Sequence, residues 1–228
     1  QMTRFFILYF CVNLINNLIH PVTPAYVESL NMPDYVFGLL FATMSFSNFL
    51  FSPFWGELSD RKGRVTVIRI CMTGYAVGQF GFAVCDSLPF ILFFRFFAGI
   101  FSGGFLVTAL AYISDMTKGH ERTKTLSFFA ALVTMAVSVG FFIGGFLGKL
   151  NIYYTFMLQI PLLLIETFLF KIFLPESLSE EKRIKEKINF KKIIKIIDIE
   201  KGKEILTFPI VIFFIGVILT EFSRVGFN

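Results

Sequence analysis

The chain has 228 residues, of which 55% are hydrophobic, 18% are aromatic and only 16% are charged, and its mean hydropathy is +0.72. Soluble domains carry about 25% charged residues, and a soluble fold of this size has no core large enough to bury so much apolar surface. The same figures exclude a disordered chain, which is poor in aromatic residues and rich in charge. The composition therefore indicates an integral membrane protein with several spans.

Seven long apolar runs predict seven membrane-spanning helices, since a bilayer core requires about 20 apolar residues of helix. The runs lie near residues 4–27, 36–56, 65–84, 89–113, 125–148, 152–174 and 205–225. Helices are favoured over strands because the runs are long and do not alternate. Turn-forming sequences such as SDRKGR and DMTKGHER separate them. We expect an all-α membrane protein.

A charged stretch divides these helices into six before it and one after it. We expect residues 1–175 to form a six-helix unit, residues 176–204 to form an amphipathic linker on the inner membrane surface, and residues 205–228 to begin a second unit. A solvated loop is the alternative for the linker. Because Gln1 precedes Met2 and nothing follows the seventh helix to pack against it, we expect the sequence to be the front portion of a longer protein.

The basic residues predict the orientation of the chain. With the N-terminus in the cytoplasm, eighteen of the 21 Lys and Arg face the cytoplasm, Lys149 and Arg224 face outward, and Arg95 lies within the membrane. Cytoplasmic loops of membrane proteins are rich in Lys and Arg. We therefore expect a multi-pass protein of the cell membrane with a cytoplasmic N-terminus. The same distribution explains the pI of 9.1 without a nucleic-acid partner.

The first apolar run carries one polar face. Asn13, Asn16, Asn17 and His20 are spaced i, i+3, i+4 and i+7, so they share one side of a helix. Amides in hydrocarbon are costly unless they find partners, which predicts that this face looks into a wet cavity. Hydrogen bonds between helices are the alternative. Weaker polar stripes in the second and fifth runs add Asn48, Thr134 and Ser138 to the expected cavity.

The most specific sequence is GELSDRKGRV, at residues 56–65 between the second and third runs. Gly56 has no side chain, so another helix can approach it closely, and Gly63 permits a tight turn. Asp60 is an anion at the membrane boundary that can pair with Arg64. Such a cluster can hold one conformation of a two-state protein and release it in the other.

This loop resembles the signature G-x-L-[SA]-D-R-x-G-R-[RK] of the major facilitator superfamily of secondary transporters. The chain matches it at Gly56, Leu58, Ser59, Asp60, Arg61, Gly63 and Arg64, and departs from it at Val65. The resemblance implies the front of a twelve-helix transporter, whose first half is a six-helix bundle of two inverted three-helix repeats. It also implies that the loop latches the outward-open state and that Asp115 is the acidic partner of Arg64. A plain polar helix end is the alternative for Asp115.

Two further stretches resemble the same family. RFFAGIFSGG in the fourth run matches at Arg95, Gly99, Ser102 and Gly103, which places Arg95 and Ser102 on one helical face toward the cavity. Arg95 snorkelling to the outer surface is the alternative. GFFIGG in the fifth run resembles the antiporter motif at Gly140, Gly144 and Gly145, with Phe141 in place of a proline. Close helix packing through small residues is the alternative for that motif.

The resemblance is to drug and tetracycline exporters of the proton-antiporter branch, through HPVTPAYVESL at residues 20–30 and SPFWGELSDRKGR at residues 52–64. It implies multidrug efflux of small, partly hydrophobic compounds in exchange for protons. Glu166 and Glu221, the acids well inside apolar runs, are the candidate proton sites; pairing of Glu166 with Lys171 is the alternative. A sugar or organic-acid uptake symporter of the same superfamily is the runner-up, and a non-transporting membrane scaffold or membrane enzyme is a different class.

Sequence motifs of enzymes do not occur in the chain. There is no phosphate-binding loop, zinc-protease motif or hydrolase nucleophile motif, and the two histidines lie on separate elements. We therefore expect neither an enzyme nor an ATP-driven pump, and no cofactor. The cysteines Cys11, Cys71 and Cys85 are irregularly spaced, so no metal site is expected.

Overall fold

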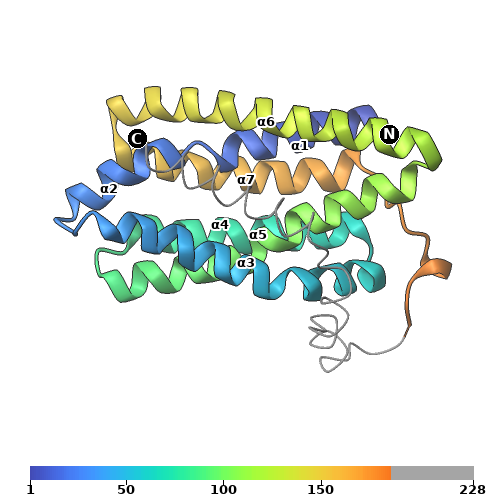
Figure 1. Ribbon diagram of the computed structural model, residues 1–228, viewed down its shortest axis with the longest axis horizontal. Coiled ribbons are helices and arrows are strands. Elements are labelled where there is room, and N and C mark those ends of the chain that lie inside the picture. Colours follow the sequence, from blue (N-terminus) through green and yellow to red (C-terminus); the bar gives the residue numbers. More distant parts are fainter. Residues whose placement is uncertain (186–228) are drawn as a thin grey trace, which may run out of the picture. The chain divides into compact units, whose positions relative to one another are not determined.

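The computed structural model describes residues 1–185, and this part of the chain consists of helices without strands (Figure 1). Six spans are long and apolar enough to cross a membrane. The first contains α1 (Met2–Asn16), the 3₁₀ turn η1 (His20–Val22) and α2 (Thr23–Ser29), and the others are α3 (Tyr35–Lys62), α4 (Arg64–Val84), α5 (Leu88–Met116), α6 (Gly119–Leu150) and α7 (Ile152–Phe173). A further 3₁₀ turn, η2, covers Glu180–Lys182.

The six spans confirm the first six predicted helices, and the predicted seventh helix at 205–225 lies outside the described residues. The expected boundaries were too short at the charged ends. The apolar run ends near residue 56, but α3 continues to Lys62, and α6 begins at Gly119 instead of near 125. Hydropathy identifies only the apolar part of a helix. Backbone hydrogen bonds continue the helix into the charged sequence beyond it.

The first span is broken near its outer end. The α-helix ends at Asn16, and the chain continues through η1 and α2, each with a proline in its first turn, Pro21 and Pro24. A proline lacks a backbone N–H and cannot continue the hydrogen-bond ladder of a preceding helix. The break therefore falls beside the polar residues Asn17 and His20.

The helices pair as two similar groups of three. Span one packs on α6 and α7, and α5 packs on α3 and α4 in the corresponding way, while α4 and α7 contact each other at the centre. Exchanging the first three spans for the last three reproduces the same set of contacts. Because the first three consecutive spans are odd in number, the last three cross the membrane in the opposite sense. This pattern confirms the expected pair of inverted repeats.

Aromatic side chains fill the core at the end that holds the N-terminus. The ring of Phe5 stacks on Tyr112 with centroids 4.6 Å apart, and Tyr9 lies 5.3 Å from Phe105 and 4.9 Å from Phe129. At the opposite end, the Tyr26 hydroxyl donates to the carbonyls of Phe82 and Cys85 at 3.0 and 2.9 Å, which satisfies the last turn of α4. The core thus joins α1, α5 and α6 at one end and α2 and α4 at the other.

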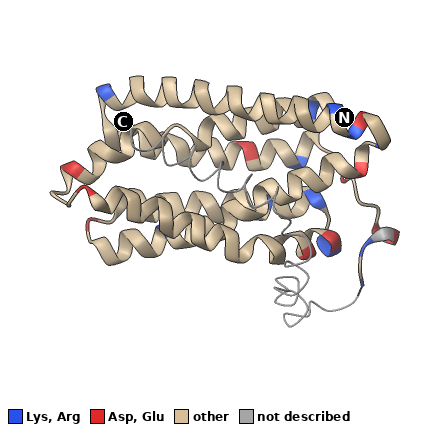
Figure 2. Ribbon diagram, in the orientation of Figure 1, with Lys and Arg blue, Asp and Glu red and all other residues tan. Residues whose placement is uncertain are grey.

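Charged residues are distributed unequally between the two ends. Figure 2 shows most of the Lys and Arg at the end of the bundle marked by the N-terminus, where the α3–α4 and α5–α6 turns also lie. Large apolar side chains such as Phe142, Phe49 and Phe168 are exposed along the helices between the ends, at 79%, 66% and 60%. An exposed apolar belt between polar ends is what a multi-pass membrane protein presents to lipid.

Candidate functional site

A cavity of about 210 Å³ lies inside the bundle, where the polar face of α1 meets α3, α4, α5, α6 and α7. All four polar residues predicted on the first helix line it: Asn13, Asn16, Asn17 and His20. Aromatic and thioether side chains form much of the remaining wall: Tyr9, Tyr75, Phe101, Phe105, Met44 and Met72. The cavity therefore combines a few amides and one imidazole with a polarisable apolar lining.

The amides of α1 are anchored by their own helix. Asn13 Nδ2 donates to the Tyr9 carbonyl at 2.8 Å, and Asn17 Nδ2 donates to the Asn13 carbonyl at 2.7 Å. Among the described residues, the buried Oδ1 of Asn16 and Nδ1 of His20 have no hydrogen-bond partner. Buried polar atoms are normally paired, so these two cavity residues each carry a polar atom that the described part of the chain leaves unsatisfied.

Gln159 of α7 is a buried polar residue at this site that the sequence analysis missed. Its Nε2 donates to the carbonyls of Ile15 and Asn16 at 2.9 and 3.1 Å. These carbonyls lie at the end of α1, where the break in the helix removes their usual partners. Gln159 thereby stabilises the break. No local pattern predicts this role, since 143 residues separate Gln159 from Asn16.

The other predicted cavity residues differ in position. Ser102 lines the cavity and accepts a hydrogen bond from Asn48 Nδ2 at 3.2 Å. Asn48 does not line the cavity itself and contacts it through Ser102. Thr134 and Ser138 are exposed on α6, and each donates its hydroxyl to a carbonyl of its own helix at 3.0 Å. Neither lines the cavity of the described residues. Their role at a substrate site remains a prediction.

Arg95 of α5 is buried, with 2% of its surface exposed. Its guanidinium carbon lies 3.8 Å from the centroid of the Phe82 ring, a cation–π geometry, and its Nη1 lies 3.7 Å from the sulfur of Met44. Its Nε and Nη2 have no partner among the described residues. Met44 lines the cavity and Arg95 does not, so the Met44 side chain lies between Arg95 and the cavity. Its predicted contact with the cavity remains untested.

Glu166 of α7 is buried, at 6% exposure, with no hydrogen-bond partner for its Oε2 within residues 1–185. The ion pairs of the described residues do not include Glu166, and Lys171, its alternative partner, is exposed. Leu163, about one turn earlier on the same helix, lines the cavity. Glu221 lies outside the described residues.

The glycines of α6 lie against the first span. A Cβ atom on Gly140 would come within 2.5 Å of the Leu14 carbonyl oxygen, and one on Gly144 would overlap the Leu18 carbonyl. Gly145 differs, because its nearest neighbour would be Pro21 Cβ at 4.0 Å. Close approach of α6 backbone to α1 is therefore the geometry at Gly140 and Gly144. Phe141 stacks on His20, with centroids 5.8 Å apart.

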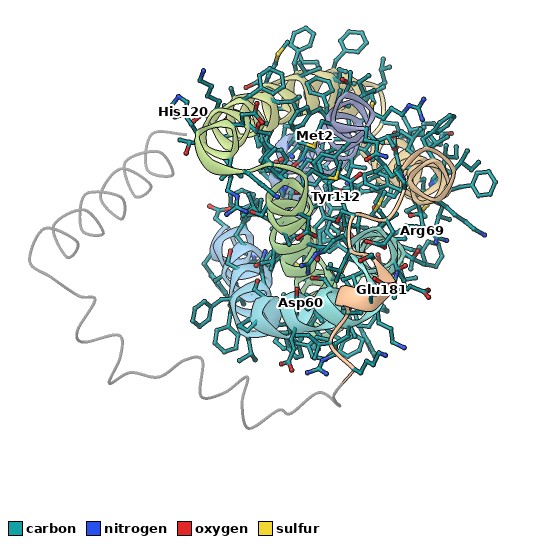
Figure 3. All side chains as sticks on the ribbon, turned by 90° about the vertical axis from the view of Figure 1, so that its right-hand side faces the viewer. Met2, Asp60, Arg69, Tyr112, His120 and Glu181 are labelled. Atoms are coloured by element: carbon teal, nitrogen blue, oxygen red, sulfur yellow. The ribbon has the colours of Figure 1, made fainter. Side chains whose placement is uncertain are left out.

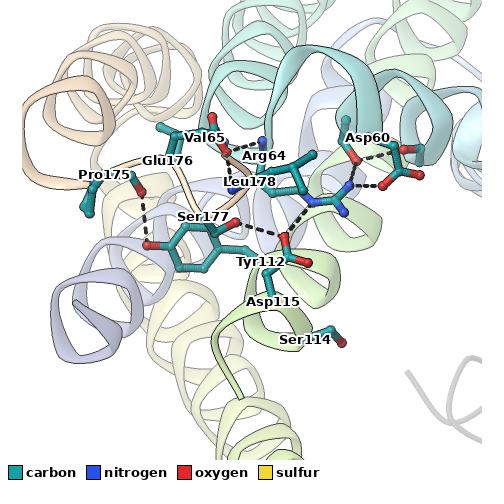
Figure 4. A network of polar contacts seen from close by, with 12 residues as sticks. Asp60, Arg64, Val65, Tyr112, Ser114, Asp115, Pro175, Glu176, Ser177 and Leu178 are labelled. Atoms are coloured by element: carbon teal, nitrogen blue, oxygen red, sulfur yellow. Dashed lines mark hydrogen bonds and ion pairs between the residues drawn. The ribbon is translucent and has the colours of Figure 1, made fainter. Parts of the chain in front are cut away.

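A second cluster lies at the N-terminal end of the bundle (Figure 4). Gly63, with φ +97°, is the single residue between α3 and α4, a conformation that glycine adopts without strain. The Arg64 side chain next to it is 8% exposed. Its Nη1 lies 2.6 Å from Asp60 Oδ1 and donates to Ser59 Oγ at 2.6 Å, and its Nε lies 2.9 Å from Asp115 Oδ2. Arg64 therefore joins the ends of α3, α4 and α5.

The remaining signature residues lie beside this cluster. Arg61 forms an ion pair with Glu57 on the same helix, one turn earlier. Gly56 faces α5, where an added Cβ would meet Val107 Cγ1 at 3.3 Å. Both residues lie within α3, so most of the predicted loop is helical and only Gly63 forms the turn.

Glu176, just after α7, belongs to the cluster and was missed by the sequence analysis. Its carboxylate accepts the backbone N–H of Arg64 at 2.5 Å and of Val65 at 3.2 Å, the first donors of α4. A carboxylate is favoured at a helix N-terminus because unpaired N–H groups and the helix dipole attract negative charge. Ser177 donates to Asp115 Oδ2 at 3.0 Å. The chain after α7 is thereby attached to the α3–α4 turn.

The described residues hold no group of three or more His, Cys, Asp or Glu side chains that could bind a metal ion. A bundle of two inverted three-helix repeats, with a polar cavity inside and an ion-pair cluster at one end, defines one half of a secondary transporter. Residues 5–226 match the sequence profile of the Major Facilitator Superfamily. The chain belongs to this superfamily.

Curated relatives of the chain are resistance proteins. It is 29% identical over 151 residues to the quinolone resistance protein NorA of Staphylococcus aureus, a match of 65% of this chain and 39% of NorA. It is 27% identical over 166 residues to the multidrug resistance protein 2 of Bacillus subtilis, a match of 73% of this chain and 42% of that protein. The chain therefore spans about two fifths of the length of these relatives.

Solved transporters share the fold. The human organic anion transporter MFSD10 (TETRAN) superposes with a TM-score of 0.69 at 24% identity, over 85% of this chain and 52% of that one. The xylose transporter XylE of E. coli, in an inward-open conformation, superposes with a TM-score of 0.62 at 17% identity, over 98% of this chain and 61% of that one.

Proposed function

We propose that this protein exports small, partly hydrophobic compounds from the cell by alternating access. The observation that carries the proposal is the cavity of about 210 Å³ with amides on one wall and aromatic and methionine side chains on the others. Flexible thioethers and aromatic rings adapt to differently shaped apolar molecules, and a few polar groups orient them. The resistance proteins named above are its relatives, which favours export over uptake of a sugar or organic acid.

The ion-pair cluster supports a two-state mechanism. Arg64 is held by Asp60 on α3 and by Asp115 on α5, and the Glu176 carboxylate holds the start of α4 from the chain after α7. Elements joined by a few strong contacts can change state together when those contacts break. We infer that the cluster closes the cytoplasmic end of this half in one state and is released in the other.

Proton exchange is the proposed energy source, with Glu166 as its candidate site. A buried carboxylate within a span is costly as an anion and marks a proton relay in many transporters. Glu166 is buried, has an unpaired oxygen and lies about one turn from the cavity residue Leu163. A protein driven in this way needs neither ATP nor an enzymatic active site.

The proposed orientation puts the N-terminus and the Arg64 cluster in the cytoplasm of the cell. Single cysteines in a cysteine-free background test it by their reaction with an impermeant reagent. We expect labelling from outside at Asn31 and Leu150, and labelling only from the cytoplasmic side at Lys62 and Lys118. Reaction of Lys118→Cys from outside would overturn the topology.

Export itself is tested with the complete gene product in a host that lacks its own exporters. We expect lower accumulation of a quinolone and of a lipophilic dye, and loss of this effect when the proton gradient is collapsed. Asn17→Leu, which removes a cavity amide, should abolish the effect. Thr43→Val is the matched control, because Thr43 is half-buried on α3, does not line the cavity, and donates its hydroxyl to its own helix at 2.7 Å. Increased uptake of a sugar or organic acid instead would favour the alternative.

A further inference from the structure

A groove of about 390 Å³ lies on the side of the bundle, separate from the cavity. It is lined by Thr66, Arg69, Ile70 and Thr73 of α4, Phe101 of α5 and Thr167 of α7. The cavity and the groove share only Phe101 among their lining residues. Figure 3, which looks along the helices, labels Arg69 at the border of α4 and α7 on the outside of the bundle.

Arg69 is a cation without a carboxylate partner. Its Nε donates to the Thr167 carbonyl at 3.3 Å, and the four ion pairs of the described residues do not include it. Arg69 is five residues into α4, so it lies about 7.5 Å along the helix from its start. Lys171, exposed one turn beyond Thr167 on α7, is likewise absent from those ion pairs. One cation without a carboxylate partner therefore lines the groove, and a second, Lys171, lies one turn from its lining residue Thr167.

The surface that continues from the groove toward the membrane centre is apolar and exposed. Ile70, Val77, Phe80 and Val84 are 43%, 50%, 50% and 48% exposed, and their spacing places them on one face of α4. This face extends from Arg69 toward the outer end of the helix. An anion bound at Arg69 would thus have an apolar strip beside it, interrupted at Thr73, which suits a molecule with a charged head and a long chain.

We propose that this groove binds an anionic phospholipid of the leaflet on the N-terminal side, which is cytoplasmic in the proposed topology. The phosphate pairs with the Arg69 guanidinium, whose planar N–H groups match phosphate oxygens in pairs. The Thr66 hydroxyl, which has no hydrogen bond within residues 1–185, donates to the same headgroup. One acyl chain lies along the part of the strip nearest the groove, from Ile70 toward Val77. Basic pockets between spans at the cytoplasmic side recognise lipid headgroups by this chemistry.

Native mass spectrometry of the full chain in detergent measures lipid retained after mixing with phosphatidylglycerol, phosphatidylethanolamine or inorganic phosphate. We expect retention of phosphatidylglycerol above phosphatidylethanolamine, and Arg69→Gln should reduce it about fivefold, the effect of one cation near a membrane surface. Arg4→Gln is the control, because Arg4 lies at the same end of the bundle and, like Arg69, takes part in no ion pair of the described residues, but it does not line the groove. It should retain the lipid as the unmodified protein does.

A second variant covers the case in which Arg69→Gln does not fold. Ile70→Trp keeps Arg69 and fills the groove from an exposed, lipid-facing position, and it should also lower phosphatidylglycerol retention. Equal retention of the two lipids, or full retention in both Arg69→Gln and Ile70→Trp, overturns the proposal. Retention of inorganic phosphate in place of lipid also overturns it, because the apolar strip then has no role.

Discussion

The surroundings of two buried arginines, one in the ion-pair cluster and one near the cavity, differ in how far they compensate the charge. Arg64, in the cluster at the N-terminal end, meets two carboxylates and a hydroxyl within 2.9 Å. Arg95, behind the cavity wall, meets an aromatic ring and a sulfur, and two of its nitrogens have no partner among the described residues. Both are inside the bundle, but of the two only Arg64 has a carboxylate partner within residues 1–185.

We infer from this difference that the cluster and the cavity have different roles. A buried charge that is fully paired fixes the elements that pair it, and removing either partner leaves the other uncompensated. Near the cavity, polar atoms of Asn16, His20 and Gln159 remain unpaired within residues 1–185, and beside the cluster the Nε and Nη1 of Arg61 do too. Unpaired buried groups are rare and need an explanation; for the cavity residues, the proposed substrate site would supply one. We therefore expect substitutions at the cluster to affect stability and state, and substitutions near the cavity to affect binding.

Replacing Arg64 should give the largest loss of stability. Arg64→Met leaves Asp60 and Asp115 without their cation, and breaking a buried ion pair costs about 3–5 kcal/mol. Both carboxylates are partly exposed, at 40% and 23%, so solvent reduces the cost, and we expect about 2 kcal/mol. Thermal unfolding of the purified protein in detergent measures it. Arg61→Met, which breaks one ion pair within α3, is the control and should cost less; equal losses would remove the special role of Arg64.

A double-mutant cycle on the transport rate tests whether Asp60 and Arg64 act as a unit. Asp60→Asn should slow turnover more than it weakens substrate binding, because the cavity lining does not include this cluster. Combined with Arg64→Ala, it should cost less than the sum of the two single changes, with a coupling of about 1–3 kcal/mol. Additive effects, or an equal loss of binding, would leave Asp60 as a determinant of folding alone.

Replacing Arg95 should have the opposite pattern from replacing Arg64. Arg95→Met removes a buried charge that has no carboxylate partner in the described residues, and apolar residues of similar volume are often neutral or stabilising in such places. We expect the melting temperature to be unchanged or higher while efflux falls about tenfold, as it would on losing one interaction of about 1.4 kcal/mol. Normal efflux with an unchanged melting temperature would exclude Arg95 from the mechanism.

The smallest structural change is Glu166→Gln, which keeps the size of the side chain and removes its titration. We expect stability to change by less than about 1 kcal/mol, because Glu166 takes part in no ion pair of the described residues. Efflux measured in vesicles at imposed pH gradients should lose its dependence on the gradient. Gradient dependence that persists in the variant would assign Glu166 a structural role and place proton coupling elsewhere.

The sequence predicted what local patterns encode. The six spans follow from apolar runs, and helical spacing predicted that Asn13, Asn17 and His20 share a face, which they do at the cavity although the α-helix ends at Asn16. Glu176 could not be predicted in the same way, because its backbone partner Arg64 is 112 residues away and a carboxylate after a helix has many possible roles. The surroundings of Arg95 were equally hidden, since Phe82 and Met44 come from two other helices and neither pairs with arginine by a charge rule.

The Glu176 contact also has a mechanical consequence. Helix α7 ends at Phe173, and three residues later the Glu176 carboxylate accepts the first N–H groups of α4. Further on, the Ile184 N–H donates to the Asp60 carbonyl at 3.1 Å. A force applied to the chain beyond residue 185 would therefore act on the turn at Gly63 before it acts on α7. Such a force would change the junction between α3 and α4.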